Sequence, residues 1–288
     1  RNTHVTYTTQ SCQCIYIWGV PGVLNTDYSI ISGGIGTGSN TVTLRWLTTG
    51  SKTVTINYNN ASGCSALSAT SSTATNVTGP TATAGAALTA ICSGGTSAAM
   101  GGTIGGTATV GTWSGGTGTW TNATNPSTAT YTAGASESGT VTLTLTTSGG
   151  ACGTTTATKN ITVNARPTVT FTAQPGASAC ANTDVTYTTQ SGQSNYVWTV
   201  PGVLNTDYSI TSGGIGTSSN TVTLRWLTTG SKTVSVNYTN ASGCSAASAT
   251  SSTATTVNAR PTVTFTAQAG ASACTNTNVT LTTQSGHS

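Results

Sequence analysis

A stretch of fourteen residues occurs twice in this chain, and it constrains the fold more than any other feature. Residues 41–54 and residues 221–234 both read TVTLRWLTTGSKTV. Apolar and polar residues alternate through TVTLRW, which is typical of a β-strand with one buried face. The Thr-Thr-Gly-Ser that follows suits a turn, after which the alternation resumes. The sequence therefore predicts a β-hairpin that is used twice, at an offset of 180 residues (41 to 221).

Two offsets organise the rest of the chain. The 180-residue offset also relates residues 20–30 to residues 200–210, and a 94-residue offset relates residues 165–174 to residues 259–268. We name this repeating unit type A and the different unit between its first two copies type B. Such long repeats suit separate β-domains better than solenoids, whose repeats have ~20–50 residues. The first expected unit, residues 1–78, is a type A repeat that lacks counterparts of residues 166–180. It is followed by type B at residues 79–165, a complete type A repeat at residues 166–258 and the start of a further type A repeat at residues 259–288.

Short alternating segments separated by turn residues are typical of a β-sandwich. In the complete type A copy we expect strands at residues 168–173, 185–190, 195–200, 208–212, 221–227, 232–238 and 249–257. In type B we expect strands at residues 110–114, 118–122, 141–146 and 156–163, with the Gly-rich residues 93–106 as a loop. Burial of a large aromatic side chain contributes about 2–3 kcal/mol. The expected core aromatics are Trp18, Trp46, Trp113, Trp120, Trp198 and Trp226.

The composition argues against several classes of protein. Hydrophobic residues make up 35% of the chain and charged residues 4%, so it lacks the high charge of a disordered segment. The eight Lys and Arg residues are scattered, whereas nucleic-acid binding normally shows a clustered basic face. No window approaches the ~20 consecutive apolar residues of a membrane helix. Because the chain starts within a repeat, we expect it to be an internal part of a longer protein, in which a missing signal peptide is uninformative.

Two segments carry a resemblance to known families. Tyr196-Val-Trp-Thr-Val-Pro-Gly202 resembles the aromatic-x-Trp strand and Gly turn of PKD (polycystic kidney disease) domains, and residues 228–243 are similar to the end of that family. Residues 129–146 of type B resemble the Ig-like repeats of very long Bacteroidota surface proteins, the gliding adhesins and related type IX secretion cargo. The resemblance implies an all-β fold of tandem Ig/PKD-like sandwiches in an elongated array at the cell surface. PKD domains often carry acidic residues after the Trp, and residues 199–201 depart from this, so no calcium role is expected there.

The eight cysteines fall at ordered positions. In complete type A, Cys180 precedes the second strand and Cys244 follows the sixth, and Cys92 and Cys152 hold similar positions in type B. One bridge per sandwich is the simplest assignment, so we predict structural disulfides Cys92–Cys152 and Cys180–Cys244, each contributing roughly 4 kcal/mol by loop-closure entropy. Disulfides imply export to an oxidising compartment. Cys64 is the counterpart of Cys244, and Cys274 is the counterpart of Cys180. The bonding partner of each is expected outside this sequence.

The last two cysteines, Cys12 and Cys14, replace a Gly and a Ser of the other type A copy. A structural metal site needs about four ligands, and only His4 and Cys64 could add to this pair. A rearranged bridge to Cys64, or an uncertain local sequence, is therefore the better interpretation.

No set of residues indicates an active site. Two of the four acidic residues, Asp27 and Asp207, occupy the same position in the two type A copies and therefore belong to different sandwiches. No sandwich thus offers the paired carboxylates of glycoside hydrolysis. His4 and His287 lie outside the repeat pattern, so no Ser–His–acid triad is indicated. The Gly-rich residues 32–39 lack the Lys and the helix of a phosphate loop. We predict no catalytic, cofactor-binding or metal-binding residues and no cofactor.

Four basic side chains, Arg45, Arg225, Lys52 and Lys232, are expected on the outward side of their strand or near its turn. We expect them to protect exposed strand edges from pairing with other chains. The functional alternative is a weak repeated contact along a filament or with an anionic glycan.

The sequence favours a structural stalk of a long cell-surface or extracellular fibre, with no enzymatic activity. Proline restricts its own φ and the preceding residue, so the linkers at residues 163–167 and 257–261 are expected to be semi-rigid. The expected partners are neighbouring repeats, other copies of the chain and surface glycans, with no nucleic acid and no membrane span. Two alternatives stay open: adhesion by the repeats themselves, through loops such as residues 208–220, and an accessory array attached to a secreted hydrolase.

Overall fold

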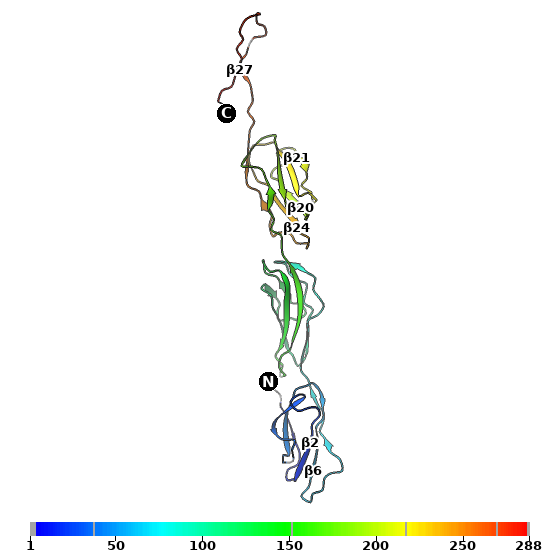
Figure 1. Ribbon diagram of the computed structural model, residues 1–288. Helices are drawn as coiled ribbons and strands as arrows, with labels where there is room; N and C mark the ends of the chain where they lie inside the picture. Colours follow the sequence, from blue (N-terminus) through cyan, green and yellow to red (C-terminus); the bar gives the residue numbers. More distant parts are fainter. Residues whose placement is uncertain (1–3, 37, 151, 217, 269, 287–288) are drawn as a thin grey trace. The chain divides into compact units, whose positions relative to one another are not determined.

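The computed structural model describes residues 4–36, 38–150, 152–216, 218–268 and 270–286. His287, residue 37 of the Gly-rich loop and residue 217 of its second copy lie outside these ranges. The chain divides into two compact units, Arg1–Ala165 and Arg166–Ser288. All regular elements of the described ranges are β-strands (Figure 1), and none is a helix that could span a bilayer. The expected all-β fold of tandem sandwiches is confirmed.

The first unit begins with a type A sandwich whose core is formed by residues between Tyr16 and Val54. Its sheets have the strand orders β1-β4-β3, β2-β6-β7 and β5-β8. The strands are β1 (Val5–Thr8), β2 (Ile15–Gly19), β3 (Tyr28–Gly33), β4 (Thr41–Trp46), β5 (Gly50–Lys52), β6 (Thr55–Asn59), β7 (Thr70–Ser71) and β8 (Thr75–Val77).

The type B sandwich follows, with a core around Trp113, Tyr131 and Leu143. Its sheets have the orders β10-β16-β15-β12, β11-β9 and β13-β14. Residues 93–106 were expected to form only a loop, which is wrong at their end, because Ile104 of β11 pairs with Ala82 of β9. The strands are β9 (Pro80–Thr83), β10 (Ile91–Cys92), β11 (Thr103–Gly106), β12 (Val110–Ser114), β13 (Thr119–Thr121), β14 (Thr130–Thr132), β15 (Gly139–Ser148) and β16 (Thr156–Asn164).

The second unit contains the complete type A sandwich, with sheets ordered β17-β19-β22-β21, β18-β26-β23 and β20-β24-β25. The single strand expected at residues 232–238 is two strands, because β23 pairs with β26 whereas β24 pairs with β20 and β25. The strands are β17 (Phe171–Ala173), β18 (Ser178–Cys180), β19 (Asp184–Thr189), β20 (Ser194–Thr199), β21 (Tyr208–Gly213), β22 (Thr221–Trp226), β23 (Gly230–Lys232), β24 (Ser235–Thr239), β25 (Thr250–Ser251) and β26 (Thr255–Asn258).

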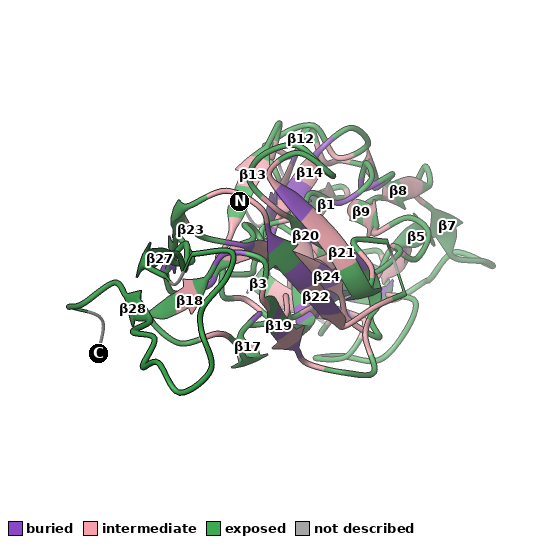
Figure 2. Ribbon diagram, turned by 90° about the horizontal axis from the view of Figure 1, so that it is seen from above, coloured by how far each residue is buried: buried purple, intermediate pink, exposed green. Residues whose placement is uncertain are grey.

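The last part of the chain adds one strand pair without a core. β27 (Phe265–Ala267) pairs with β28 (Thr282–Thr283), and both strands are exposed throughout (Figure 2). This pair corresponds to β17 and the end of β19, which in the complete copy pack beside β22.

The duplicated segment forms the central strand of one sheet in each type A copy. In β22, Val222, Leu224 and Trp226 are buried, while Arg225 points outward. β4 lies between β1 and β3, and β22 lies between β19 and β21, so neither strand is an edge. The expectation that these arginines protect a strand edge is therefore wrong.

Candidate functional site

The ends of the sandwiches are the best candidate site, because the linkers attach there by specific hydrogen bonds. We name the end where the chain arrives the incoming end and the end where it leaves the outgoing end. In the complete type A copy, Arg166 Nη1 donates to Ser245 O at the incoming end over 2.7 Å. At the outgoing end, Arg260 Nε donates to Ala181 O over 2.8 Å. The two arginines are counterparts in the two Val-Asn-Ala-Arg-Pro linkers.

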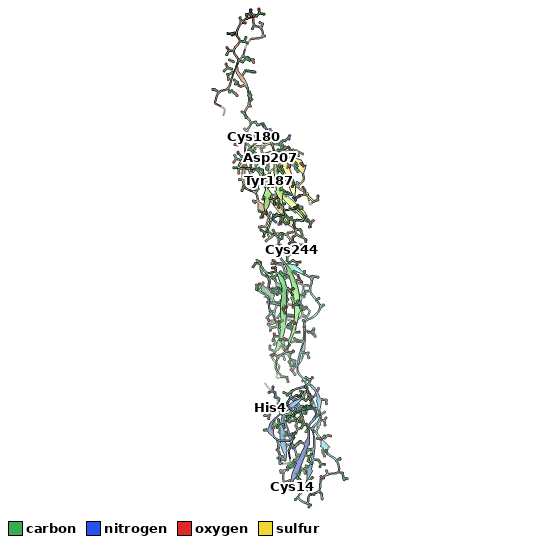
Figure 3. The ribbon with its side chains drawn as sticks, in the orientation of Figure 1. His4, Cys14, Cys180, Tyr187, Asp207 and Cys244 are labelled. Carbon is green, nitrogen blue, oxygen red and sulfur yellow. The ribbon has the colours of Figure 1, made fainter. Side chains whose placement is uncertain are left out.

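The predicted Cys180–Cys244 disulfide is wrong. Cys180 is exposed and has a free thiol, whereas Cys244 is fully buried and takes part in a disulfide. Figure 3 shows the two residues at opposite ends of the sandwich, with Tyr187 and Asp207 between them. The reason lies in residues 230–239, which run from the outgoing end to the incoming end, and such a segment spans about 30 Å. A disulfide requires Cα atoms within about 7 Å of each other.

The predicted Cys92–Cys152 disulfide is wrong for the same reason. Cys92 pairs opposite Asn164, the last residue of β16, and does take part in a disulfide. Cys152 is exposed in the turn that precedes β16. The nine residues of β16 separate the two cysteines by about 30 Å.

Cys12, Cys14 and Cys64 are exposed free thiols, so the expected bridge to Cys64 is not formed. Cys12 has φ 64°, and its counterpart Gly192 has φ 75°, so a cysteine occupies a left-handed position that favours glycine. Within the described ranges, no group of three or more His, Cys, Asp or Glu side chains is arranged to hold a metal ion.

Asp27 and Asp207 are structural residues of a loop that the two type A copies share. Asp207 Oδ2 accepts the amide of Val203 at 2.8 Å, and Asp27 Oδ2 accepts the amide of Val23 at the same distance. Gly202 is required in this loop, because its φ is +94° and a Cβ there would lie 2.6 Å from Asp207 Cβ. These carboxylates therefore fix a turn and are not arranged for acid–base chemistry.

Glu137 holds together one end of the type B sandwich. Its carboxylate accepts bonds from Tyr131 Oη at 2.5 Å and from the amides of Thr117 and Gly134, both at 2.9 Å. Burial acts to raise the pKa of Glu137, but these hydrogen bonds outweigh it and hold the pKa below its usual value. Burial, together with the adjacent carboxylate, raises the pKa of Tyr131. A network of this kind stabilises the loop and leaves the carboxylate fully engaged.

Lys159 is a buried charge that we did not anticipate from the sequence. Its Nζ atom donates to Met100 O at 2.6 Å and to Ala86 O at 2.7 Å, and it lies 5.7 Å from the Trp113 ring centroid. Burial lowers the pKa of Lys159. The signal was present in the alternation of β16, which places Lys159 on the same face as the buried Ile161. It binds two loops to the core and is not available to a ligand.

The repeated basic residues are also engaged within their own sandwich. Lys232 Nζ lies 5.4 Å from the Trp226 ring centroid and donates to Thr228 Oγ1 at 2.9 Å. Arg225 Nε pairs with Asp184 Oδ1 at 2.8 Å, and both side chains are more than two-fifths exposed. The first copy repeats the lysine arrangement with Lys52.

The loop at residues 208–220, which we considered for adhesion, is anchored to the sandwich. Trp198 Nε1 donates to Ser219 O at 2.8 Å, and Asn220 Nδ2 donates to Thr189 O at 3.1 Å. The more prominent exposed feature is the neighbouring turn, where Val203 is 63% exposed and Leu204 is 43% exposed. The first copy has the same two exposures at its counterpart residues.

The six tryptophans occupy the cores, with one difference among them. Trp120 is half-buried and stacks on Trp113, with ring centroids 6.0 Å apart. The other four, all buried, are Trp18, Trp46, Trp198 and Trp226.

No protein-family model matches the chain, and no curated protein matches it. Solved structures that do match include the I9–I11 tandem of titin, with 11% identity, TM-score 0.36, and coverage of 90% of this chain and 94% of that one. The D00–D0 domain of intimin has 13% identity, TM-score 0.31, and coverage of 62% and 99%. The fibronectin(III)-like modules of Clostridium thermocellum CbhA have 15% identity, TM-score 0.28, and coverage of 62% and 94%. Similarity at this level concerns the fold alone. The assignment as tandem β-sandwiches rests on the strand topology of this chain.

Proposed function

We propose that this chain is a structural spacer, a segment of the stalk of a long extracellular or cell-surface fibre, without enzymatic activity. One observation carries the proposal: both ends of the complete type A sandwich are hydrogen-bonded to the linker that reaches them, through Arg166 and Arg260. A protein that must transmit a direction from one domain to the next needs such ordered linkers.

The two linker arginines each bond to the complete type A sandwich, through different nitrogen atoms. Arg166 uses Nη1 toward the sandwich that follows it, and Arg260 uses Nε toward the sandwich that precedes it. The proline after each arginine removes further freedom from the backbone. We infer a semi-rigid joint at each Val-Asn-Ala-Arg-Pro linker.

The outer faces suit a spacer better than an enzyme. Thr hydroxyls on neighbouring strands bond to each other, as in Thr6–Thr43 and Thr186–Thr223, both at 3.0 Å. Such pairs leave a neutral surface whose polar groups are already satisfied. This surface, together with the resemblance to Bacteroidota surface adhesins, supports the proposal of an extracellular repeat array, with neighbouring repeats and other copies of the chain as its partners.

Small-angle scattering of the full chain tests the spacer role. We expect an elongated particle whose maximum dimension falls when Arg166→Ala removes the linker bond, because the joint then samples bent arrangements. Arg45→Ala is the matched control, since it removes an arginine within a sandwich and should leave the maximum dimension unchanged. A compact particle for the unmodified chain contradicts the proposal.

A second candidate function is adhesion through the exposed turn of each type A copy. Val203 and Leu204 form an apolar tip that Asp207 holds in place, so binding there needs little further ordering. We expect binding of the full chain to a glycan array or surface to fall when Val203→Ser and Leu204→Ser are combined. A chain that binds nothing on such arrays supports the spacer role alone.

A further inference from the structure

The first type A sandwich carries a groove between the end of β1 and the β6–β7 pair. The groove has a volume of about 300 Å³, and Gln10, Tyr58 and Thr70 are among the residues that line it. β1 is an edge strand, because it pairs with β4 on one side and with no strand of the described residues on the other. An extended chain can add to such an edge as a further strand.

The complete type A sandwich shows which segment fills this position. Residues 168–171 lie against the counterparts of the groove residues and are held there by hydrogen bonds. Gln190 Oε1 accepts the amide of Thr170 at 3.2 Å, and Gln190 Nε2 donates to Thr168 O at 3.1 Å. Thr189 Oγ1 donates to Thr170 O at 2.7 Å. The side chains at the end of β19 therefore recognise the backbone of this segment.

The opposite wall of the groove takes part in the same way. Thr250 Oγ1 donates to Val169 O at 2.9 Å, and Tyr238 Oη donates to Thr168 O at 3.4 Å. The Val169 side chain is 4% exposed, so the segment buries an apolar residue as well as its backbone. The residues that line the groove of the first copy are the same as their counterparts here, except that Ile56 stands in place of Val236.

In the first copy, the groups that would bind such a segment bond to each other. Tyr58 Oη donates to Gln10 Oε1 at 2.5 Å, the atom whose counterpart accepts the amide of Thr170 in the complete copy. Tyr58 is half-buried, whereas its counterpart Tyr238 is 3% exposed. The first sandwich thus keeps the complete set of binding groups and lacks the segment that covers them.

The chain also carries a second copy of the segment, which covers nothing. Residues 259–268 are identical to residues 165–174. Val263, the counterpart of Val169, is 80% exposed. The pairing of β27 with the two residues of β28 is the β-structure of this part of the chain, and an isolated two-stranded pair is marginally stable at best. Release of the segment from β28 therefore costs little.

We propose that residues 262–265 of one molecule fill the groove in the first type A sandwich of a second molecule. The occupant is a second copy of this chain, bound by strand addition as residues 168–171 are bound in the complete sandwich. Backbone hydrogen bonds hold the added strand, and Val263 and Phe265 give it specificity. This site adds self-assembly to the spacer and does not rest on the spacer role.

Sedimentation and hydrogen exchange of the full chain over a dilution series test the proposal. We expect the mean mass to rise with concentration and the amides of residues 5–10 to gain protection over the same range. Phe265→Asp should abolish both effects, because a carboxylate is costly to bury in the aromatic position that Phe171 takes in the complete copy. Val279→Asp, at another exposed apolar residue outside the donor segment, is the matched control and should change neither.

A variant of the groove and a competing peptide test the other half of the contact. Gln10→Ala should weaken the association by about tenfold, because the counterpart side chain bonds to the segment at two of its residues. Gln10 is exposed, so the sandwich should stay folded, and Gln13→Ala is the control at a nearby glutamine that does not line the groove. A synthetic peptide of residues 259–268 should dissociate the complex, and the same peptide with Phe265→Asp should not.

Three outcomes overturn the inference: a constant mass at all concentrations, association that Phe265→Asp leaves unchanged, or protection of residues 5–10 that does not vary with concentration. An elongated particle that stays monomeric keeps the spacer role and rejects the strand addition. A compact particle that associates through Phe265 does the reverse.

Discussion

The two type A sandwiches share their central strand letter for letter, yet they close their cores to different degrees. Trp226 is fully buried, whereas its counterpart Trp46 is 9% exposed. Tyr187 is fully buried, whereas Tyr7 is only half-buried. In the second copy, β17 pairs with β19 and β18 pairs with β26, so both strands extend the sheets around Tyr187 and Trp226. The strand is identical in the two copies, but residues far from it in the sequence determine how deeply its side chains are buried.

Phe171 of β17 is the side chain that closes the second core. Its ring centroid lies 6.2 Å from that of Tyr187 and 6.0 Å from that of Trp198, both in edge-to-face contact. In the first copy, Tyr7 Oη bonds to Thr75 Oγ1 at 2.9 Å. In the second copy, Tyr187 Oη makes no such close hydrogen bond, and burial raises its pKa against the opposing effect of Trp226 and Thr255. Closure of the second core thus adds aromatic contacts and buries the hydroxyl of Tyr187.

Residues 259–288 extend the comparison to a third copy of the same strand. Phe265 stands in the sequence Val-Thr-Phe-Thr-Ala, as Phe171 does, but it is 61% exposed. β27 pairs only with β28, whereas β17 belongs to a four-stranded sheet that contains β22. The comparison teaches that this strand is formed locally, but that its aromatic residue is buried only when the rest of the sheet is present.

The largest expected effect comes from the shared tryptophan. Trp226→Ala should destabilise the second sandwich by about 3–5 kcal/mol, and Trp46→Ala should cost less, because the first core is already partly open. Hydrogen exchange of the full chain, read separately on peptides from each sandwich, measures both losses. Leu67→Ala, at a fully exposed leucine, is the control that should change nothing. Equal losses in the two copies contradict the comparison.

Phe171→Ala should make the second copy resemble the first. We expect a loss of about 2–3 kcal/mol, because Phe171 is half-buried and makes two edge-to-face contacts. Exchange protection in β19 and β20 should fall toward that of β1 and β2. Phe265→Ala changes the same residue in the same local sequence without a core, so its stability effect should be close to zero.

The type B sandwich provides an internal reference whose stability depends on a carboxylate. Glu137→Gln should cost roughly 2 kcal/mol at neutral pH, because hydrogen bonds to a charged group contribute about 1.5–3 kcal/mol. The folded-state pKa of Glu137 is lowered, so its contribution is present above the ordinary pKa of the carboxyl and is lost as the pH falls through the folded-state value.

Denaturation at a series of pH values, followed by exchange on type B peptides, measures this dependence. The difference between the unmodified chain and Glu137→Gln should shrink in acid, and Tyr131→Phe should reproduce part of the loss at neutral pH. A difference that stays constant from neutral to acid pH rules out the network as its source.

The smallest expected effect concerns the outward ends of the same strands. Asp184 pairs with Arg225 in the second copy, whereas His4 stands at the position of Asp184 in the first. Asp184→Asn should cost about 0.2–1 kcal/mol, since exposed ion pairs contribute little and salt screens them. His4→Asp should stabilise the first copy by a similar amount at low salt. An effect of either substitution that persists at high salt would indicate another cause.

The strands themselves were determined largely by the local sequence. Alternation in Thr-Val-Thr-Leu-Arg-Trp assigns Val42, Leu44 and Trp46 to one face, because successive side chains of a strand point to opposite faces. The same rule predicted the core tryptophans, and the alternation of β16 also places Lys159 on the buried face, although the sequence analysis assigned that residue to neither face. Turn residues marked most of the boundaries, but β23 and β24 were merged, since no local signal shows that they pair with different sheets.

The tertiary structure alone decided which ends of the strands come together. The positions of Cys180 and Cys244 in the sequence suggested one disulfide within the sandwich. The two residues lie at opposite ends of that sandwich, because strand direction and pairing fix the end at which each turn lies. Arg225 looked like an edge residue until the sheet order placed β22 in the centre. Local periodicity predicts on which face of its strand a side chain lies. Only the paired strands determine its position along the sandwich, which is why the cysteine pairing could not be obtained from spacing.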